Sequence, residues 1–419
     1  MKVERFGYRH YVLVMLTLVY VFNFIDRQLL VILQESIKTE LHLSDTQLGL
    51  LSGFTFAIFY ITLGIPIARL ADKGNRKNIV VISLGLWSFM TTFSGLARNF
   101  FQLLLARIGV GVGEAGGSPS AHAIISDYFP PEKRSTALSV YSTGIYLGML
   151  MGFIMGGFLN DHLGWRNAFY TLGIPGVIFS AIVYFTVKEP RKGATDKKCI
   201  EDQDAPSLKA VLHYLYDTRV FIYLALGCGL NVFGIYGLLN WMPSYLIRIF
   251  GMQTSQIGVY LGLIFGIGGG LGTFFGGYIT DYFGKTDKKW YLIIPALAIM
   301  ISAFSVAATF TFKNTYVMFF CLGVSTFLQS TYLGPAISVA HSLVPANMRA
   351  LTSAILFFVL NLIGLGLGPL TVGIISDRLQ PLFGSESLRW ALYTITPVSI
   401  CSSLIFYKTS EKLRLNAEA

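Results

Sequence analysis

The sequence carries little charge for its length. Only 13% of its 419 residues are Asp, Glu, Lys or Arg, whereas about 25% is usual in soluble domains. So few charges cannot cover the surface of a water-soluble protein of this size. Hydrophobic residues make up 53% of the chain, and the mean hydropathy is +0.60. We therefore expect a membrane protein, in which each spanning helix needs about 20 apolar residues.

Clustered cysteines and enzyme motifs are also missing. The four cysteines are scattered and show neither metal-ligand spacing nor a disulfide framework. The chain has no HExxH, GxSxG or P-loop pattern, and no His/Cys cluster, so nothing indicates a membrane-embedded enzyme. Nothing resembles the filter sequence of a channel either. We expect no metal and no cofactor, and we keep enzyme and channel only as alternatives of a different class.

Long apolar runs fill most of the chain, and 43 glycines suit close packing of membrane helices. The first run, Tyr11 to Leu33, is too long for a signal peptide and lacks a small-residue cleavage site. The pattern predicts an all-α membrane protein with twelve transmembrane helices, at about 9–33, 46–70, 78–97, 100–125, 136–160, 167–187, 219–247, 256–280, 290–311, 315–341, 350–376 and 389–407.

A polar stretch divides these helices into two groups of six. It runs from Lys188 to Asp217 and contains no apolar run. We therefore predict an N-terminal six-helix bundle over residues 1–187, a cytoplasmic linker over 188–217, and a C-terminal six-helix bundle over 218–419.

The basic residues explain the net charge of +10. They gather in alternate short loops, in the linker and at the C-terminus, as the positive-inside rule expects of cytoplasmic segments. We therefore expect a multi-pass protein of the cytoplasmic (inner) membrane with both termini in the cytoplasm. Because the basic residues sit in loops between apolar runs, we expect no binding to nucleic acid.

The two halves of the chain resemble each other. Thr46-Gln47-Leu48-Gly49 opens the second predicted helix, and Ser255-Gln256-Ile257-Gly258 opens the eighth, 209 residues later. Asp72 and Asp281 close the same two helices at the same offset. Pseudo-symmetric halves around a central site are an architecture of secondary transporters, which work by alternating access.

The motifs resemble those of the major facilitator superfamily. The loop Asp72 to Lys77 has the family's Asp, Gly and basic residues, although its glycine stands one place early. Arg107 is followed by Gly109, Gly111 and Gly113, as in the family's fourth helix. The fifth predicted helix is rich in glycine but lacks the Gly-Pro pair of the antiporter motif. The resemblance implies the major facilitator fold.

A narrower resemblance is to the Spinster-like branch, which moves lysolipids and sphingoid phosphates. It rests on Asn23-Phe24-Ile25-Asp26-Arg27 and on the run Arg107 to Ala115. It implies transport of an amphipathic anion. We expect a monomer whose partners are its substrate and the membrane lipids. Organic-anion symporters of the same superfamily share the Asp-Arg and Glu-Ala pairs, so a symporter for small organic anions or sugars is the alternative.

Four charges lie deep inside predicted helices, where a charge costs several kcal/mol and indicates function: Asp26, Arg27, Arg107 and Glu114. At 1.5 Å per residue, Asp26 and Arg107 each lie roughly 12 Å from the outer end of their helices. They can therefore meet as an ion pair. Glu114 lies on the same helix face as Arg107, about 10 Å deeper.

These charges suggest a coupling mechanism. Asp26 and Glu114 are the candidate proton-coupling residues, with the proton as the coupling ion. Protonation of Asp26 would free Arg107 or Arg27 to hold an anionic headgroup. The alternative is an ion pair that only locks two helices together. Arg27 projects about 100° away from Asp26 around the helix, so it either contacts substrate or extends toward the membrane surface.

Polar residues in other spans are candidates for substrate binding. Asn23 lies one turn before Asp26, and the second half offers Asn231, Gln329 and Tyr332. The alternative for each amide is a hydrogen bond between helices.

The loop charges are candidates for gating. Asp72 stands at the C-terminal end of a helix, where the helix dipole disfavours an anion, so it needs a basic partner. The family resemblance implies that Asp72, Arg76, Arg134 and Asp281 latch the two halves in the outward-open state. The alternative is that the basic residues only fix the topology.

Overall fold

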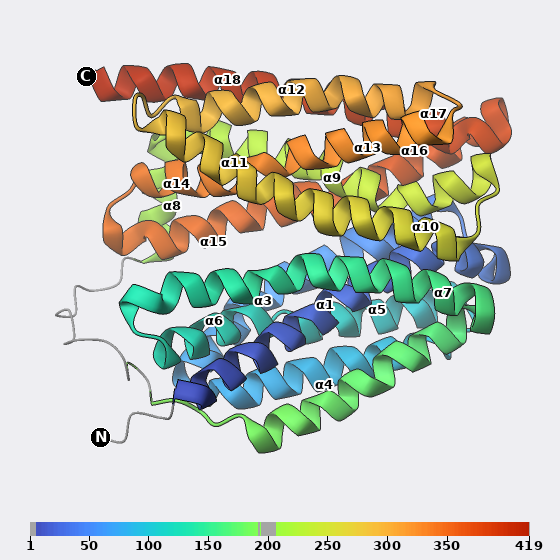
Figure 1. Ribbon diagram of the computed structural model, residues 1–419, viewed down its shortest axis with the longest axis horizontal. Coiled ribbons are helices and arrows are strands. Elements are labelled where there is room, and N and C mark those ends of the chain that lie inside the picture. Colours follow the sequence, from blue (N-terminus) through green and yellow to red (C-terminus); the bar gives the residue numbers. More distant parts are fainter. Residues whose placement is uncertain (1–5, 192, 194–206, 419) are drawn as a thin grey trace. The chain divides into compact units, whose positions relative to one another are not determined.

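The computed structural model describes residues 6–191, 193 and 207–418, except the side chains of 6, 65, 68, 69, 71–73, 346 and 414–418. Throughout these ranges every regular element is a helix (Figure 1). The described chain forms two compact units. Among the described residues, unit 1 comprises 6–191, 193 and 250–262, and unit 2 comprises 207–249 and 263–418. The segment 250–262 thus groups with unit 1, although it follows the predicted linker.

Unit 1 is built around two long helices. Its elements are α1 (Phe6–Leu41), α2 (Asp45–Gly49), the π-helical turn η1 (Leu50–Phe54), α3 (Thr55–Lys73), α4 (Arg76–Ser94), α5 (Phe100–Glu114), α6 (Gly117–Tyr128), α7 (Pro131–Thr186) and α10 (Thr254–Leu261). The 56 residues of α7 are two helices joined at Gly164, where φ is 80°. That left-handed backbone is readily adopted by glycine.

Unit 2 contains the remaining elements. They are α8 (Leu208–Asp217), α9 (Arg219–Phe250), η2 (Gly262–Gly268), α11 (Gly269–Gly284), α12 (Trp290–Thr311), α13 (Thr315–Gln329), η3 (Ser330–Tyr332), α14 (Leu333–Ser342), η4 (Ala346–Met348), α15 (Arg349–Val359), η5 (Leu360–Leu367), α16 (Gly368–Phe383), η6 (Gly384–Glu386), α17 (Ser387–Tyr393) and α18 (Ile395–Glu418). Within this unit α12 packs against α13 and α18 (Figure 1).

Helix α8 lies where the sequence predicted only a polar linker. The hydroxyl of Ser207 accepts a hydrogen bond from the backbone N–H of Ala210 and so caps the helix. Val211 and Leu215, one turn apart, are buried in the hydrophobic core of unit 2. These two residues dock the short helix, while Leu212 and the charged or polar Lys209, His213 and Asp217 stay exposed.

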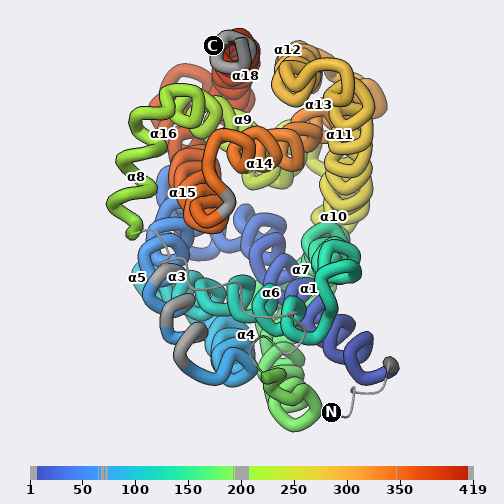
Figure 2. The backbone as a smooth tube through the Cα atoms, turned by 90° about the vertical axis from the view of Figure 1, so that its left-hand side faces the viewer, coloured from blue at the N-terminus to red at the C-terminus, as the bar shows by residue number. Residues whose placement is uncertain are grey.

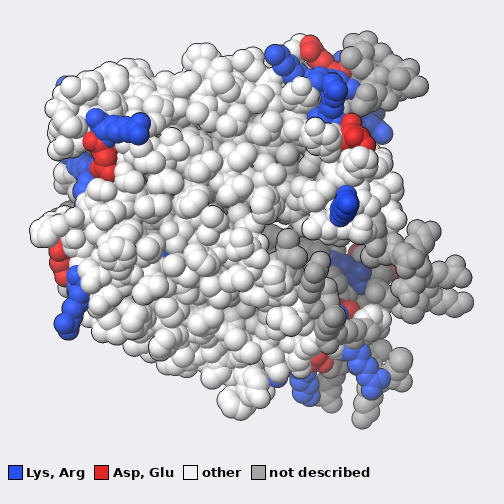
Figure 3. Space-filling view, turned by 180° about the vertical axis from the view of Figure 1, so that it is seen from behind, with Lys and Arg blue, Asp and Glu red and all other residues white. Residues whose placement is uncertain are grey.

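Eight segments of the described chain are helical, long and apolar enough to cross a membrane: Gly7–Leu41, Asp45–Gly64, Pro131–Thr186, Arg219–Phe250, Thr254–Gly284, Trp290–Thr311, Thr315–Ser342 and Arg349–Leu413. The predicted spans 78–97 and 100–125 fall on α4 and on α5–α6, which are not among these eight. On the face drawn in Figure 3, charged side chains lie toward two opposite edges and leave a broad uncharged surface between them.

The close packing of α1 on α7 explains the glycines of the fifth predicted helix. The two helices run side by side in both ribbon and tube views (Figures 1 and 2). A methyl group at Gly148 would lie 2.7 Å from the Val21 carbonyl oxygen, and one at Gly152 would lie 3.0 Å from the Ile25 Cα. Only glycine allows the backbones to approach this closely.

Replacing Gly148 should therefore separate these helices. We expect Gly148→Ala to destabilise the protein by about 1–3 kcal/mol, as overpacking of a core does. The matched control is Gly64→Ala, because a methyl group there meets nothing within 4 Å. The measurement is the thermal midpoint of each purified variant in detergent. Equal midpoints for the two variants would contradict the close approach of α1 and α7.

Candidate functional site

Four buried charges of unit 1 form two ion pairs. Asp26 and Arg27 come from α1, and Arg107 and Glu114 come from α5. Asp26, Arg107 and Glu114 are only 4%, 2% and 1% exposed. The side chain of Arg27 is 14% exposed. Two positive and two negative groups thus share one region, and their formal charges cancel.

The first pair joins Asp26 to Arg107, as the helix depths predicted. Arg107 Nη1 lies 3.3 Å from Asp26 Oδ2. The hydroxyl of Thr91, on α4, donates to the other carboxylate oxygen of Asp26. The same hydroxyl lies 2.8 Å from the carbonyl oxygen of Trp87. Thr91 therefore has one proton for two acceptors, and this contact was not anticipated from the sequence.

The second pair joins Arg27 to Glu114. Arg27 Nη2 and Nε lie 2.7 and 2.8 Å from Glu114 Oε2. Arg27 therefore turns into the bundle, and the extension toward the membrane surface that the sequence left open is not seen. Glu114 Oε1 is buried and accepts no hydrogen bond from the described residues, so one acceptor of this carboxylate remains available.

Aromatic rings surround the Arg27 guanidinium. Its central carbon lies 5.0, 4.7 and 5.2 Å from the ring centres of Phe24, Phe56 and Tyr60, which we call the Arg27 cage. The ring of Phe56 also lies 5.8 Å from the guanidinium carbon of Arg107. Attraction between a cation and a ring face stabilises both arginines without neutralising them.

The turn η1 helps to place this cage. A π-helical turn takes more residues per turn than an α-helix and rotates the helix face that follows. Phe56 and Tyr60 follow η1 directly, four residues apart on one face of α3, and their rings stack at 5.6 Å. Such turns are frequent at functional sites.

The other candidates for substrate binding lie in two places. In unit 1 the buried Asn23 has a side-chain oxygen that receives no hydrogen bond from the described residues. In unit 2 the Asn231 amide nitrogen donates to the backbone oxygen of Gln329 at 3.1 Å. This hydrogen bond joins two helices. Two other side-chain atoms, Asn231 Oδ1 and Gln329 Nε2, are buried and form no hydrogen bond with the described residues. Tyr332 lies in the hydrophobic core of unit 2.

The predicted gate residues have separate surroundings. Arg76 forms an ion pair with Asp127 at the end of α6. The Arg134 guanidinium donates to the Ser126 carbonyl oxygen at 2.9 Å. Asp281, in unit 2, accepts from the Tyr291 hydroxyl at 2.8 Å. The side chain of Asp72 lies outside the described residues.

Two acidic residues near Arg76 were not predicted from the sequence. Glu189 accepts the backbone N–H groups of Arg76 and Lys77 at 3.2 and 2.7 Å, and so caps the N-terminus of α4. Asp127 accepts the backbone N–H of Gly193 at 3.0 Å besides pairing with Arg76. The start of the predicted linker is thus fixed to α4 and α6. The sequence could have identified Asp127, because it is an acidic residue at a helix end beside a basic loop.

Known proteins share this arrangement of helices. The sequence profile described as Major Facilitator Superfamily matches residues 16–369. The chain belongs to the Major Facilitator Superfamily. This transporter is 33% identical to an MFS-type efflux pump of Mycolicibacterium smegmatis, with 95% of this chain and 92% of the relative covered. It is 28% identical to protein spinster homolog 1 of Xenopus tropicalis, with 98% and 83% covered.

A solved structure shows the same relationship to Spinster proteins. The crystal structure of a bacterial homolog of the human lysosomal transporter Spinster, inward-facing and unoccupied, superposes with a TM-score of 0.88 at 30% identity. The match covers 96% of this chain and 97% of that chain. The protein is therefore a Spinster-like transporter of this superfamily, a multi-pass integral membrane protein and not an enzyme.

The charge cluster of this transporter can exchange partners. Each carboxylate is held by a guanidinium, so uptake of one proton by a carboxylate leaves one guanidinium without an anionic partner. An unpaired buried cation is costly and attracts an anion.

Breaking one ion pair should cost more than removing it entirely. Arg27→Met leaves the Glu114 carboxylate buried without its cation, and we expect a loss of about 3–5 kcal/mol. The double variant Arg27→Met/Glu114→Gln removes both charges and should lose clearly less. Thermal midpoints in detergent, compared as a double-mutant cycle, measure the difference.

The control is the partly exposed pair of Glu386 and Arg389 in unit 2. Glu386→Gln should cost no more than about 1 kcal/mol, as surface ion pairs do. A double variant as unstable as the sum of its single variants would show that Arg27 and Glu114 do not interact.

Proposed function

We propose that this protein is a proton-coupled secondary active transporter that works by alternating access. We propose an amphipathic anion as its substrate, such as a lysophospholipid or a sphingoid phosphate. The observation that carries the proposal is the buried, charge-balanced cluster of Asp26, Arg27, Arg107 and Glu114. Ionisable groups at this depth in a membrane helix bundle are typical of ion and substrate pathways.

Proton coupling is assigned to Asp26 and Glu114. A proton on Asp26 weakens its ion pair with Arg107, and a proton on Glu114 does the same for Arg27. The freed guanidinium then binds the anionic substrate. Loss of the proton restores the ion pair and expels the anion. The proposed exchange thus involves these four residues, the proton and the substrate anion.

The substrate class follows from the surroundings of the arginines. A guanidinium offers a planar fork of donors that matches a phosphate group. Around Arg27 the rings of Phe24, Phe56 and Tyr60 add an apolar surface suited to the chain of a lipid. Asn23 is assigned to the same ligand through its available amide oxygen. The resemblance to the Spinster-like branch supports this class.

One observation favours a second candidate, a symporter for small organic anions or sugars. In unit 2, Asn231 Oδ1 and Gln329 Nε2 are a buried acceptor and donor with no other described partner, and such a pair fits a hydroxyl group. The same pair serves the polar backbone of a lysolipid or sphingoid phosphate, so we assign Asn231 and Gln329, with Tyr332 beside them, to the substrate in either case.

We propose twelve membrane crossings in two pseudo-symmetric bundles. The eight long segments become ten if Pro131–Thr186 and Arg349–Leu413 each cross twice, with reversals at Gly164 and Gly384, both of which have positive φ. Helix α4 and the α5–α6 pair add two more. The basic loops support insertion in the cytoplasmic membrane with both termini inside, and we propose that the protein is a monomer.

We also assign a gate to Asp72, Arg76, Arg134 and Asp281. One support is the resemblance of the loop Asp72 to Lys77 to the corresponding loop of the family. The other is that Arg76 is held by a hydrogen bond to the Ala123 carbonyl oxygen and by an ion pair with Asp127. Asp127 and Glu189 join this group, because they hold Arg76 and the first turn of α4 in place.

The first test concerns coupling. Asp26→Asn keeps the size of the side chain but cannot take up a proton, so uptake driven by a pH gradient in proteoliposomes should be abolished. Glu40→Gln is the matched control, because Glu40 is an exposed α1 carboxylate that also pairs with an arginine, Arg166. It should transport as wild type does. Full pH-driven uptake by folded Asp26→Asn would refute the coupling role.

The second test concerns the substrate. Proteoliposomes with and without a pH gradient are supplied with a lysophospholipid, a sphingoid phosphate, a hexuronate or a dicarboxylate. We expect gradient-dependent uptake of the two lipids, and its loss in Arg107→Gln, because an amide lacks the charge that holds a phosphate. Uptake of the small anions alone would favour the second candidate.

A further inference from the structure

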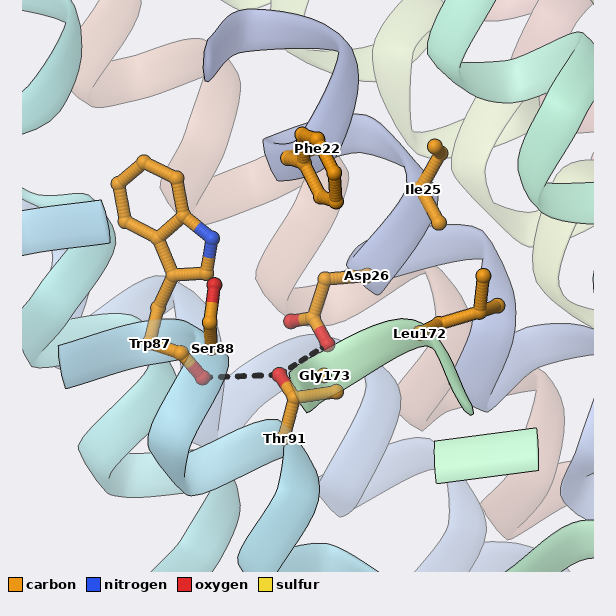
Figure 4. Close-up of a pocket in the computed structure, with 8 residues that line it drawn as sticks. All are labelled: Phe22, Ile25, Asp26, Trp87, Ser88, Thr91, Leu172 and Gly173. Carbon is orange, nitrogen blue, oxygen red and sulfur yellow. Dashed lines mark hydrogen bonds between the residues drawn. The ribbon is translucent and has the colours of Figure 1, made fainter. Parts of the chain in front are cut away.

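A small cavity lies against Asp26. Its volume is about 10 Å³, close to the lower limit of roughly 10–15 Å³ needed for one water molecule. Its polar lining consists of Asp26 from α1 and Ser88 and Thr91 from α4, with the indole of Trp87 beside them (Figure 4). Phe22 and Ile25 of α1 and Leu172 and Gly173 of α7 complete the wall. Arg107 approaches the same carboxylate from α5, which does not line the cavity.

Trp87 provides an independent sign of a ligand. The residue is 1% exposed, and its indole Nε1 makes no hydrogen bond within the described chain. A buried donor left without an acceptor is unfavourable. Figure 4 shows this nitrogen on the edge of the ring that faces the cavity, near the Ser88 hydroxyl and across from the Asp26 carboxylate. A donor, a hydroxyl and a carboxylate thus surround one small space.

The chemistry of Asp26 needs a partner that can both donate and accept. An ionised carboxylate only accepts hydrogen bonds, whereas a carboxylic acid must also donate one. Arg107, Arg27 and the Trp87 indole can only donate, and Leu172 and Gly173 bring no titratable side chain from α7. Thr91 can reverse its hydrogen bond, but its proton also serves the Trp87 carbonyl. A water molecule can reverse freely and has room in the cavity.

We propose that this cavity is a binding site for one water molecule, held by Trp87 Nε1, the Ser88 hydroxyl and the Asp26 carboxylate. The water donates to Asp26 when the residue is ionised and accepts from it when the residue is protonated. Asp26 thereby keeps a full set of hydrogen bonds in both states. Polar groups of Asp26, Ser88 and Thr91 reach this otherwise apolar cavity, and a buried water needs two to four such polar partners. Only the switching role rests on the proposed proton coupling; the water site itself does not.

The direct test is a structure of the wild-type protein at a resolution that shows ordered water. We expect density for one water within hydrogen-bond distance of Trp87 Nε1 and of an Asp26 carboxylate oxygen. Well-defined side chains around a cavity without density would overturn the proposal.

Infrared difference spectroscopy tests the switching role. The carbonyl stretch of protonated Asp26 is the band lost in Asp26→Asn. Trp87→Phe keeps most of the ring and removes the donor that holds the water, so the band should move to higher wavenumber. Trp241→Phe is the matched control, because its indole donates at 2.8 Å to the Pro369 carbonyl oxygen in unit 2, and it should leave the band unchanged.

The variants give separate outcomes. If Trp87→Phe does not fold, Ser88→Ala removes another partner of the water and should shift the band in the same direction. An unchanged Asp26 band in a folded variant would overturn the role of the water, as would the lack of any Asp26 band at acid pH. Failure of pH-driven transport alone would refute the proposed function, while water density in the wild type would still support the site.

Discussion

The cost of burying charge among apolar helices governs unit 1. Asp26, Arg27, Arg107 and Glu114 lie where water cannot solvate them, so each is held by an opposite charge. The pairing requires α1 to lie near α5 at a fixed height and rotation. Glycines of α7 help to set the position of α1, because they let its backbone approach closely along Val21 and Ile25. The glycine pattern and the charge pattern are therefore parts of one arrangement.

This balance also makes the cluster responsive. A neutral set of four charges is disturbed by a single proton, and the disturbance is relieved only by an anion or by loss of the proton. The ring of Phe56, close to both guanidinium groups, links the two pairs physically. Thr91 and the cavity beside Trp87 add polar contacts on the other side of Asp26. A transporter that couples two ligands needs a linkage of this kind.

Sequence periodicity predicted most helices because long apolar runs have few alternatives to a spanning helix. It missed α8, a short helix docked by two buried residues, Val211 and Leu215. It also predicted breaks between 160 and 167 and between 376 and 389, and the positive-φ glycines Gly164 and Gly384 lie in these two gaps. It also missed Glu189, which caps α4 from more than a hundred residues away in the chain.

The sequence by itself determined the family, the helical class and the identity of the four buried charges, because hydropathy and motifs are local properties. Helix depth, which needs only a count of residues, also predicted that Asp26 meets Arg107. Only the tertiary structure decided that Arg27 turns to Glu114 and that Thr91, Phe56 and Trp87 surround the pairs. The reason is geometric: a residue count gives height along a helix, but the side chains it meets depend on the rotation of each helix and on the neighbour packed against it.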